Sequence, residues 1–144
     1  MESGGAWRDT GRAMSEENIE LVRQTEEALL RRDRDAWFAI HDEDFEIVPV
    51  RDWVEGGVRG REAGWDFHMR ILDSFEWEAI EVEHVDAGAD KVLAHLRSDA
   101  RGVGSGAEVQ LDQWFVTTVR EGKILRLQWF TDGVEARKAA GLRE

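Results

Sequence analysis

The amino-acid sequence predicts an α+β fold in which helices come first and a curved antiparallel sheet follows. Residues 107–131 contain two apolar runs joined by a Glu-Gly turn, which is typical of a β-hairpin. Residues 15–73 carry apolar side chains mostly at helical spacing. Within 75–86 the apolar phase slips by one residue between Ala79 and Ile80, as it does at a β-bulge, and bulges bend strands. We therefore expect the helices to pack in the hollow of a bent sheet.

Three helices are expected before the main sheet. Ser15 is followed by two glutamates and fits a helix N-terminus, because a side-chain oxygen and negative charge both stabilise the first turn. Asp33 fits the N-cap of a second, short helix. A third helix is expected over residues 61–73, and its apolar face carries Trp65 and Met69, with His68 beside them.

The strands are predicted from alternation. A short strand over residues 45–48 ends at Pro49, and longer strands follow over 75–86, 90–100, 107–120 and 123–131. Asp132 fits the N-cap of a last helix, which ends at Gly141. In the strand 90–100 the alternation places Val92, Ala94 and Leu96 on one face. It places His95, Arg97 and Asp99 on the opposite face.

The length of 144 residues predicts one domain, over residues 14–144. We expect the Gly-rich, polar residues 1–13 to be a disordered tail; the alternative is that they lie upstream of a second start site at Met14. The chain has no cysteine, which excludes disulfides and thiolate metal sites. That composition favours a reducing, cytoplasmic location.

The charge balance excludes some partners. The chain has 19 basic and 31 acidic residues, a net charge of −12, and such a surface repels the phosphates of nucleic acids. No apolar run is long enough to span a membrane. The four histidines do not have the spacing of a metal motif, so we expect neither a metal nor a cofactor.

Several short segments, in this order, carry a resemblance to a known family. They are the helix that begins at Ser15, Gly60-Arg61-Glu62, the strand ending at 97–102, Arg120-Glu121-Gly122-Lys123-Ile124, Trp129-Phe130-Thr131-Asp132, Glu135-Ala136 and Ala140-Gly141-Leu142. Over residues 14–143 the chain thereby resembles the SnoaL-like branch of the nuclear-transport-factor-2-like superfamily.

The resemblance implies a cone-shaped α+β barrel, in which a curved antiparallel sheet wraps around the N-terminal helices and encloses a deep apolar pocket. It also implies a homodimer that forms through the sheet, and Phe115 and Leu127 are our candidates for that outer face. The fold hosts isomerases, hydrolases, cyclases and non-catalytic domains, so it does not determine a reaction.

The resemblance also allows known chemistries to be tested. Limonene-epoxide-hydrolase-like enzymes use an Arg-x-Asp pair on a central strand, and Arg97-Ser98-Asp99 is similar to it. We expect Arg97 and Asp99 to point into the cavity; the alternative is that they belong to the solvated face of the sheet. The family's further acid would fall near Trp129, where no acid stands.

Two other chemistries fit less well. SnoaL-type cyclases use an acid on a late strand, for which Asp112 is the nearest candidate; the alternative is that Asp112 is a solvated carboxylate at the strand edge. Ketosteroid isomerases need a carboxylate where this chain has Val48, and a tyrosine, which the chain lacks. That activity is therefore not expected.

The sequence thus predicts a small-molecule-binding domain with an apolar pocket and an unassigned reaction. One alternative is a hydrolase, isomerase or cyclase of a polyketide-, terpenoid- or steroid-like substrate, and another is a non-catalytic dimerisation domain. The residues expected to bind the ligand are Trp53, Trp65, His68, Met69, Trp114 and Trp129.

Overall fold

The computed structural model describes the backbone of residues 3–50, 56–88 and 90–142. Within these ranges the side chains are described from Glu16 onward, except that of Asp86. Within these residues the chain forms four helices and one six-stranded sheet. The helices are α1 (Ser3–Arg31), α2 (Arg34–Ala39), α3 (Arg61–Asp73) and α4 (Gly133–Ala139). The strands are β1 (His41–Val48), β2 (Val58–Arg59), β3 (Phe75–Asp86), β4 (Lys91–Gly102), β5 (Glu108–Arg120) and β6 (Lys123–Phe130).

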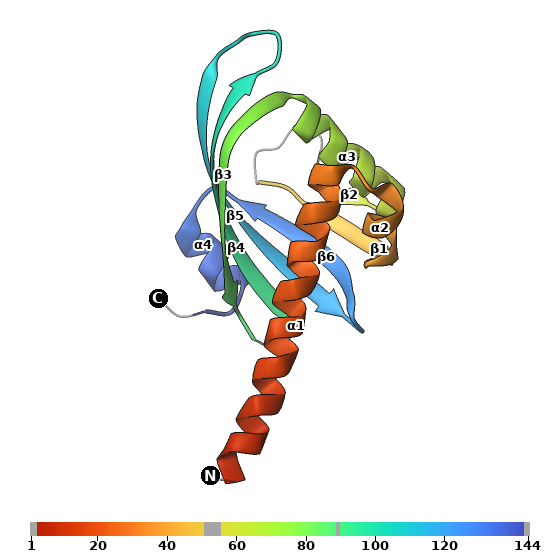
Figure 1. Ribbon diagram of the computed structural model, residues 1–144, viewed down its shortest axis with the longest axis vertical. Coiled ribbons are helices and arrows are strands. Elements are labelled where there is room, and N and C mark those ends of the chain that lie inside the picture. The colour runs from red at the N-terminus through yellow and green to blue at the C-terminus, as the bar shows by residue number, and fades with distance from the viewer. Residues whose placement is uncertain (1–2, 51–55, 89, 143–144) are drawn as a thin grey trace.

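The strands follow the order β2-β1-β6-β5-β4-β3. All neighbours pair antiparallel except β1 and β6, which are parallel. The sheet is curved and has two edges, so the α+β class is confirmed but the sheet is not closed into a barrel. Its concave face is covered by α1, α2 and α3, and α4 packs on the opposite face against β5 and β6 (Figure 1). We refer to these as the concave face and the outer face.

Local capping explains where two helices begin. The side chain of Asp33 accepts a hydrogen bond from the backbone nitrogen of Ala36 at 3.1 Å, and Asp132 accepts one from Val134 at 2.8 Å. Each carboxylate satisfies a backbone N–H that has no partner within its helix. The predicted N-caps of α2 and α4 are both confirmed.

The curvature arises in part from a bulge in β3. Its pairing with β4 shifts register between Trp77 and Ala79, next to the predicted slip. As a result Trp77 and Ile80 lie on the same face, although they are three positions apart and a regular strand would place them on opposite faces. The bulge therefore turns the apolar side chains at both ends of β3 toward the concave face.

The backbone of α1 begins at Ser3, twelve residues before the predicted helix start at Ser15, and its first turns extend away from the sheet (Figure 1). The side chains before Glu16 lie outside the described residues. The disorder of residues 1–13 therefore stays a prediction.

Two apolar clusters hold the layers together. On the concave face, Trp37, Phe45 and Ile124 are almost fully buried among α1, α2 and α3. On the outer face, Leu93 and Val116 are buried beneath α4. The middle of the sheet is thus covered on both faces.

Candidate functional site

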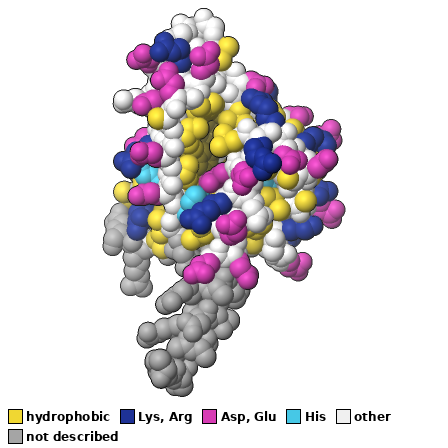
Figure 2. Space-filling model, viewed as in Figure 1, with side chains coloured by type: hydrophobic (Ala, Val, Ile, Leu, Met, Phe, Trp, Pro, Cys, Tyr) yellow, Lys and Arg dark blue, Asp and Glu magenta, His cyan; other side chains and the backbone are white. Residues whose placement is uncertain are grey.

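An apolar hollow lies between α1, α3 and the concave face of the sheet. It has a volume of about 210 Å³. Figure 2 shows its hydrophobic side chains gathered in a depression near the middle of this view, with charged side chains around it. Each surrounding element contributes apolar side chains, among them Phe45, Phe67, Val82, Leu96, Phe115 and Trp129.

Few polar side chains reach this cavity. Among the described residues they are Thr25, Glu26, His41, His68, Gln113 and Thr117, and they include no lysine or arginine. An apolar cavity with a small number of placed polar groups is typical of small-molecule sites, since the apolar walls give affinity and the polar groups fix orientation.

His41 stands at the start of β1 and is 2% exposed. Its Nδ1–H donates a hydrogen bond to the backbone carbonyl of Trp37 at 2.7 Å, and its ring stacks on the Trp37 indole at 3.7 Å between centroids. The other nitrogen, Nε2, then carries a lone pair and faces the hydroxyl of Thr25 at 3.4 Å. Burial lowers the pKa of His41 to about 3, with His68 and Arg61 adding to the effect.

His68 lies on α3 and also contacts Trp37, edge to face, with the ring centroids 5.9 Å apart. Burial in these apolar surroundings lowers the pKa of His68 to about 4. Its ring nitrogens form no hydrogen bond with the rest of the described chain. Both imidazoles are therefore uncharged at neutral pH.

A carboxylate also reaches the cavity. Glu26 on α1 contacts Nε2 of His84 on β3 through both of its oxygens, at 2.8 and 3.0 Å. The His84 side chain is 9% exposed and that of Glu26 is 32% exposed. The pair joins α1 to the edge strand at the rim of the cavity.

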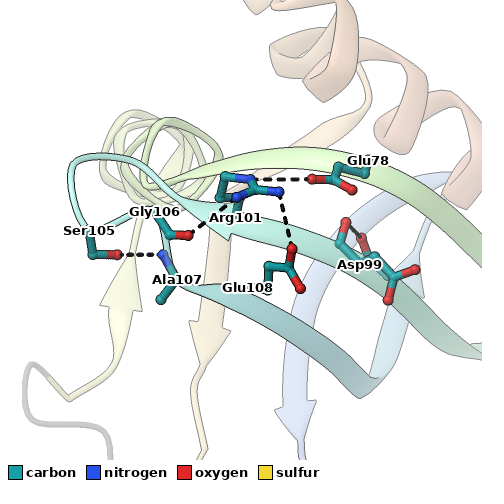
Figure 3. A network of polar contacts seen from close by, with 8 residues as sticks. Glu78, Asp99, Arg101, Ser105, Gly106, Ala107 and Glu108 are labelled. Carbon is teal, nitrogen blue, oxygen red and sulfur yellow. Dashed lines mark hydrogen bonds and ion pairs between the residues drawn. The ribbon is translucent and has the colours of Figure 1, made fainter.

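The predicted direction of Arg97 and Asp99 is wrong. Both side chains are exposed on the outer face, and Arg97 approaches Glu81 at 3.8 Å there. Their alternation with Ala94 and Leu96 is correct, but it is Ala94 and Leu96 that line the cavity. Figure 3 shows Asp99 apart from the neighbouring ion pairs, in which Arg101 joins Glu78 at 3.6 Å and Glu108 at 3.2 Å.

Asp112, the predicted cyclase acid, is also on the outer face. Its carboxylate contacts His95, and the His95 ring is stacked on Trp114 with the centroids 3.7 Å apart. The Asp112 side chain is 66% exposed. Hence none of the three predicted catalytic residues lines the cavity, and their catalytic roles stay predictions.

The residues predicted to bind a ligand divide into three groups. His68 and Trp129 line the cavity. Trp65 and Met69 belong to the apolar cluster on the same face without lining the hollow, and Trp114 lies on the outer face against His95. Trp53 lies outside the described residues. Phe115 and Leu127, predicted for the outer face, line the cavity instead.

Sequence reasoning missed His41, Thr25 and the Glu26–His84 pair. For His41 a signal was present, because it shares the odd-numbered alternation of Phe45 and Ile47, both of which are buried on the concave face. The Glu26–His84 pair joins residues 58 positions apart, which no local pattern predicts.

The described residues contain no group of three or more side chains that could hold a metal ion. Within the same residues, none of the helices has the length and apolarity needed to cross a membrane.

The sequence matches the model of the SnoaL-like domain family over residues 22–127. No curated protein matches it. A nuclear-transport-factor-2-like protein of Burkholderia xenovorans LB400 has a similar structure, with 24% identity, a TM-score of 0.73, and coverage of 87% of this chain and 96% of that one.

Two similar structures contain a small molecule. A Mycobacterium tuberculosis protein in complex with estradiol-17β-hemisuccinate is 17% identical, with a TM-score of 0.66 over 82% of this chain and 95% of that one. TerC, co-crystallised with polyporic acid, is 19% identical, with a TM-score of 0.66 over 87% and 98%. At such identities the likeness establishes the fold alone.

Proposed function

Because the chain belongs to the SnoaL-like domain family of the nuclear-transport-factor-2-like superfamily, we propose that it binds a small, largely apolar molecule in the cavity on the concave face. The proposal assigns no reaction. Two relatives of the same fold hold estradiol-17β-hemisuccinate and polyporic acid, which supports a ligand of this general kind.

One observation carries the proposal, namely the cavity itself. Monomeric proteins rarely leave a contiguous apolar surface open to water, so a hollow of about 210 Å³ with apolar walls marks a candidate ligand site. An apolar molecule that binds there would bury its own apolar surface and that of the cavity walls, and this burial stabilises the complex.

A thermal-shift screen of apolar metabolites tests the proposal. A ligand that binds the folded protein but not the unfolded chain raises the melting temperature of the protein. The Ala94→Phe variant places a ring in the cavity and should abolish that shift, whereas Arg97→Phe, three residues away on the outer face, should keep it. A shift that Ala94→Phe leaves intact would place the ligand elsewhere.

The alternative is an enzyme, a hydrolase, isomerase or cyclase of a similar molecule, and the Glu26–His84 pair favours it. A carboxylate held by an imidazole beside a cavity has the components of general acid–base catalysis. Turnover lost in Glu26→Gln, with ligand affinity retained, would support this alternative. Arg97, Asp99 and Asp112 remain candidates only for a separate site on the outer face.

We also keep the homodimer and the cytoplasmic location as proposals. Phe115 and Leu127 line the cavity, so they no longer support a dimer interface on the outer face. The support for the outer face is now the half-buried Trp114 beside α4, and light scattering at micromolar concentration tests the assembly.

A further inference from the structure

We propose that His41 and His68 form the polar end of the cavity and select an uncharged, hydroxyl-bearing ligand over its anionic counterpart. The inference rests on the proposed function, since it specifies the chemistry of the ligand for the same cavity. It is carried by the free hydrogen-bonding capacity of the two rings and by the charges around them.

The backbone determines the tautomer of His41. Since Nδ1–H donates to the Trp37 carbonyl at 2.7 Å, Nε2 is left as an acceptor, and His41 is one of the residues that line the cavity. The hydrogen-bonding neighbour of Nε2 among the described residues is the Thr25 hydroxyl, and its distance of 3.4 Å is long for an O–H···N hydrogen bond. A ligand hydroxyl that donates to Nε2 would therefore meet an acceptor that is not fully satisfied.

His68 provides the complementary group. A neutral imidazole has one N–H donor and one acceptor nitrogen, and neither nitrogen of His68 is engaged within the described part of the chain. Both histidines contact the Trp37 indole, so they lie at the same end of the cavity. Together they offer an acceptor and a donor, the two groups that a hydroxyl requires.

The charges oppose an anion. Burial keeps the pKa of both histidines well below neutrality, so neither ring supplies a positive charge at pH 7. No lysine or arginine is among the cavity-lining residues that the structure describes, and Glu26 adds a carboxylate at the rim. An anionic ligand would lose its hydration without gaining a cation, which is costly in an apolar site.

The volume limits the size of the ligand. An engineered apolar cavity of about 150 Å³ binds benzene, so a hollow of about 210 Å³ suits a molecule of roughly two fused rings. Naphthalene, 2-naphthol and 2-naphthoate are therefore matched probes, since they share one ring system and differ only in the polar group. Trp77 and Trp129 line the cavity, so their fluorescence can report binding.

The experiment is a titration of the full chain with each probe at pH 7. We expect 2-naphthol to bind about fivefold more tightly than naphthalene, as one added hydrogen bond allows, and 2-naphthoate to bind more weakly than either. Equal or tighter binding of 2-naphthoate would overturn the inference. So would equal binding of naphthol and naphthalene, which leaves the proposed function intact. If none of the probes binds, the proposed function fails as well.

Two variants assign the preference to the histidines. His41→Phe keeps an aromatic ring against Trp37 but removes the acceptor, and His68→Phe removes the other polar ring. Each should bind naphthalene as tightly as the wild type and lose most of the preference for 2-naphthol. His95→Phe, on the outer face, is the matched control and should keep the preference. If one of these two variants fails to fold, the other tests the assignment. A variant that folds and still prefers 2-naphthol over naphthalene contradicts the role of the histidine it lacks.

Discussion

His41 and His68 owe their uncharged state to burial rather than to a charged partner. His41 is buried and His68 is half-buried, so each ring lost much of its hydration when the chain folded, and an imidazolium is penalised more by that loss than a neutral ring. In the unfolded chain both would have the ordinary pKa of about 6.5. The fold is therefore linked to pH through these two residues.

The stability of the protein should fall as the pH is lowered from 6.5 toward 4. The unfolded chain gains a proton at His68 in this range and the folded chain does not, because burial lowers the folded pKa to about 4. The full stability is present above pH 6.5, and His68 alone removes about 2 to 3 kcal/mol by pH 4.5. Urea melts at pH 7.5 and 4.5 should show a smaller loss for His68→Phe than for the wild type. Equal losses would mean that His68 is hydrated in the folded protein.

Arg97 should matter little for stability. Its side chain is 57% exposed and its partner Glu81 is 77% exposed, at 3.8 Å. Exposed ion pairs contribute between 0 and about 1 kcal/mol, because water screens the attraction. A denaturant melt of Arg97→Ala should therefore show a loss in that range. A loss of about 3 kcal/mol or more would indicate a buried pair and restore the predicted inward direction.

At the scale of the elements, Gly64 sets the distance between α3 and the core. A Cβ at this position would come within 2.7 Å of the Phe45 ring and 3.2 Å of the Trp37 ring. Both rings are fully buried, so neither has room to retreat.

Gly64→Ala should consequently destabilise the protein by about 1 to 3 kcal/mol. The sign of the stability change is informative, because a Gly→Ala substitution inside an exposed helix stabilises a protein by about 1 kcal/mol. Glu62→Ala, on the exposed face of α3, is the control and should change the stability by less than about 0.5 kcal/mol. A gain in stability for Gly64→Ala would show that α3 lies further from Phe45.

The capping of α4 gives a second prediction at this scale. Asp132→Ala removes the acceptor for the Val134 N–H and should cost about 1 kcal/mol, whereas Asp132→Asn keeps an acceptor and should cost less. Thermal melts of the two variants measure the difference. Equal losses would assign the effect to the charge near the helix dipole instead of the hydrogen bond.

The elements could be predicted from the sequence because their signals are local. An N-cap aspartate, a bulge and a Glu-Gly turn each act within a few residues, and the helices and strands follow them. The direction of β4 could not be predicted in this way. Val92 and Leu93 are both fully buried, since α4 covers the outer face and α1 the concave one, so alternation did not reveal which face is inside. Arg97 and Asp99 on β4 were misplaced for this reason.

In the whole molecule the sheet bends around three helices, packs against them at one part of its concave face and leaves a hollow at another. The strands of the sheet place Leu96, Phe115 and Trp129 on the concave face, and α1 and α3 close over part of it. The chain has a net charge of −12, and charged side chains of both signs surround the hollow on the face that Figure 2 shows. A net negative charge of this size keeps copies of the protein apart and repels anions in general, in agreement with an uncharged ligand.

The central claim is that a small apolar molecule occupies this hollow, and contacts between ligand protons and protein methyl groups test it most directly. With 2-naphthol bound to methyl-labelled protein, nuclear Overhauser effects should connect its ring protons to Val22, Val82 and Leu127, which line the cavity. None should reach Leu93 or Val116 beneath α4. Effects confined to Leu93 and Val116, or saturable binding with no contact to the cavity methyls, would contradict the account.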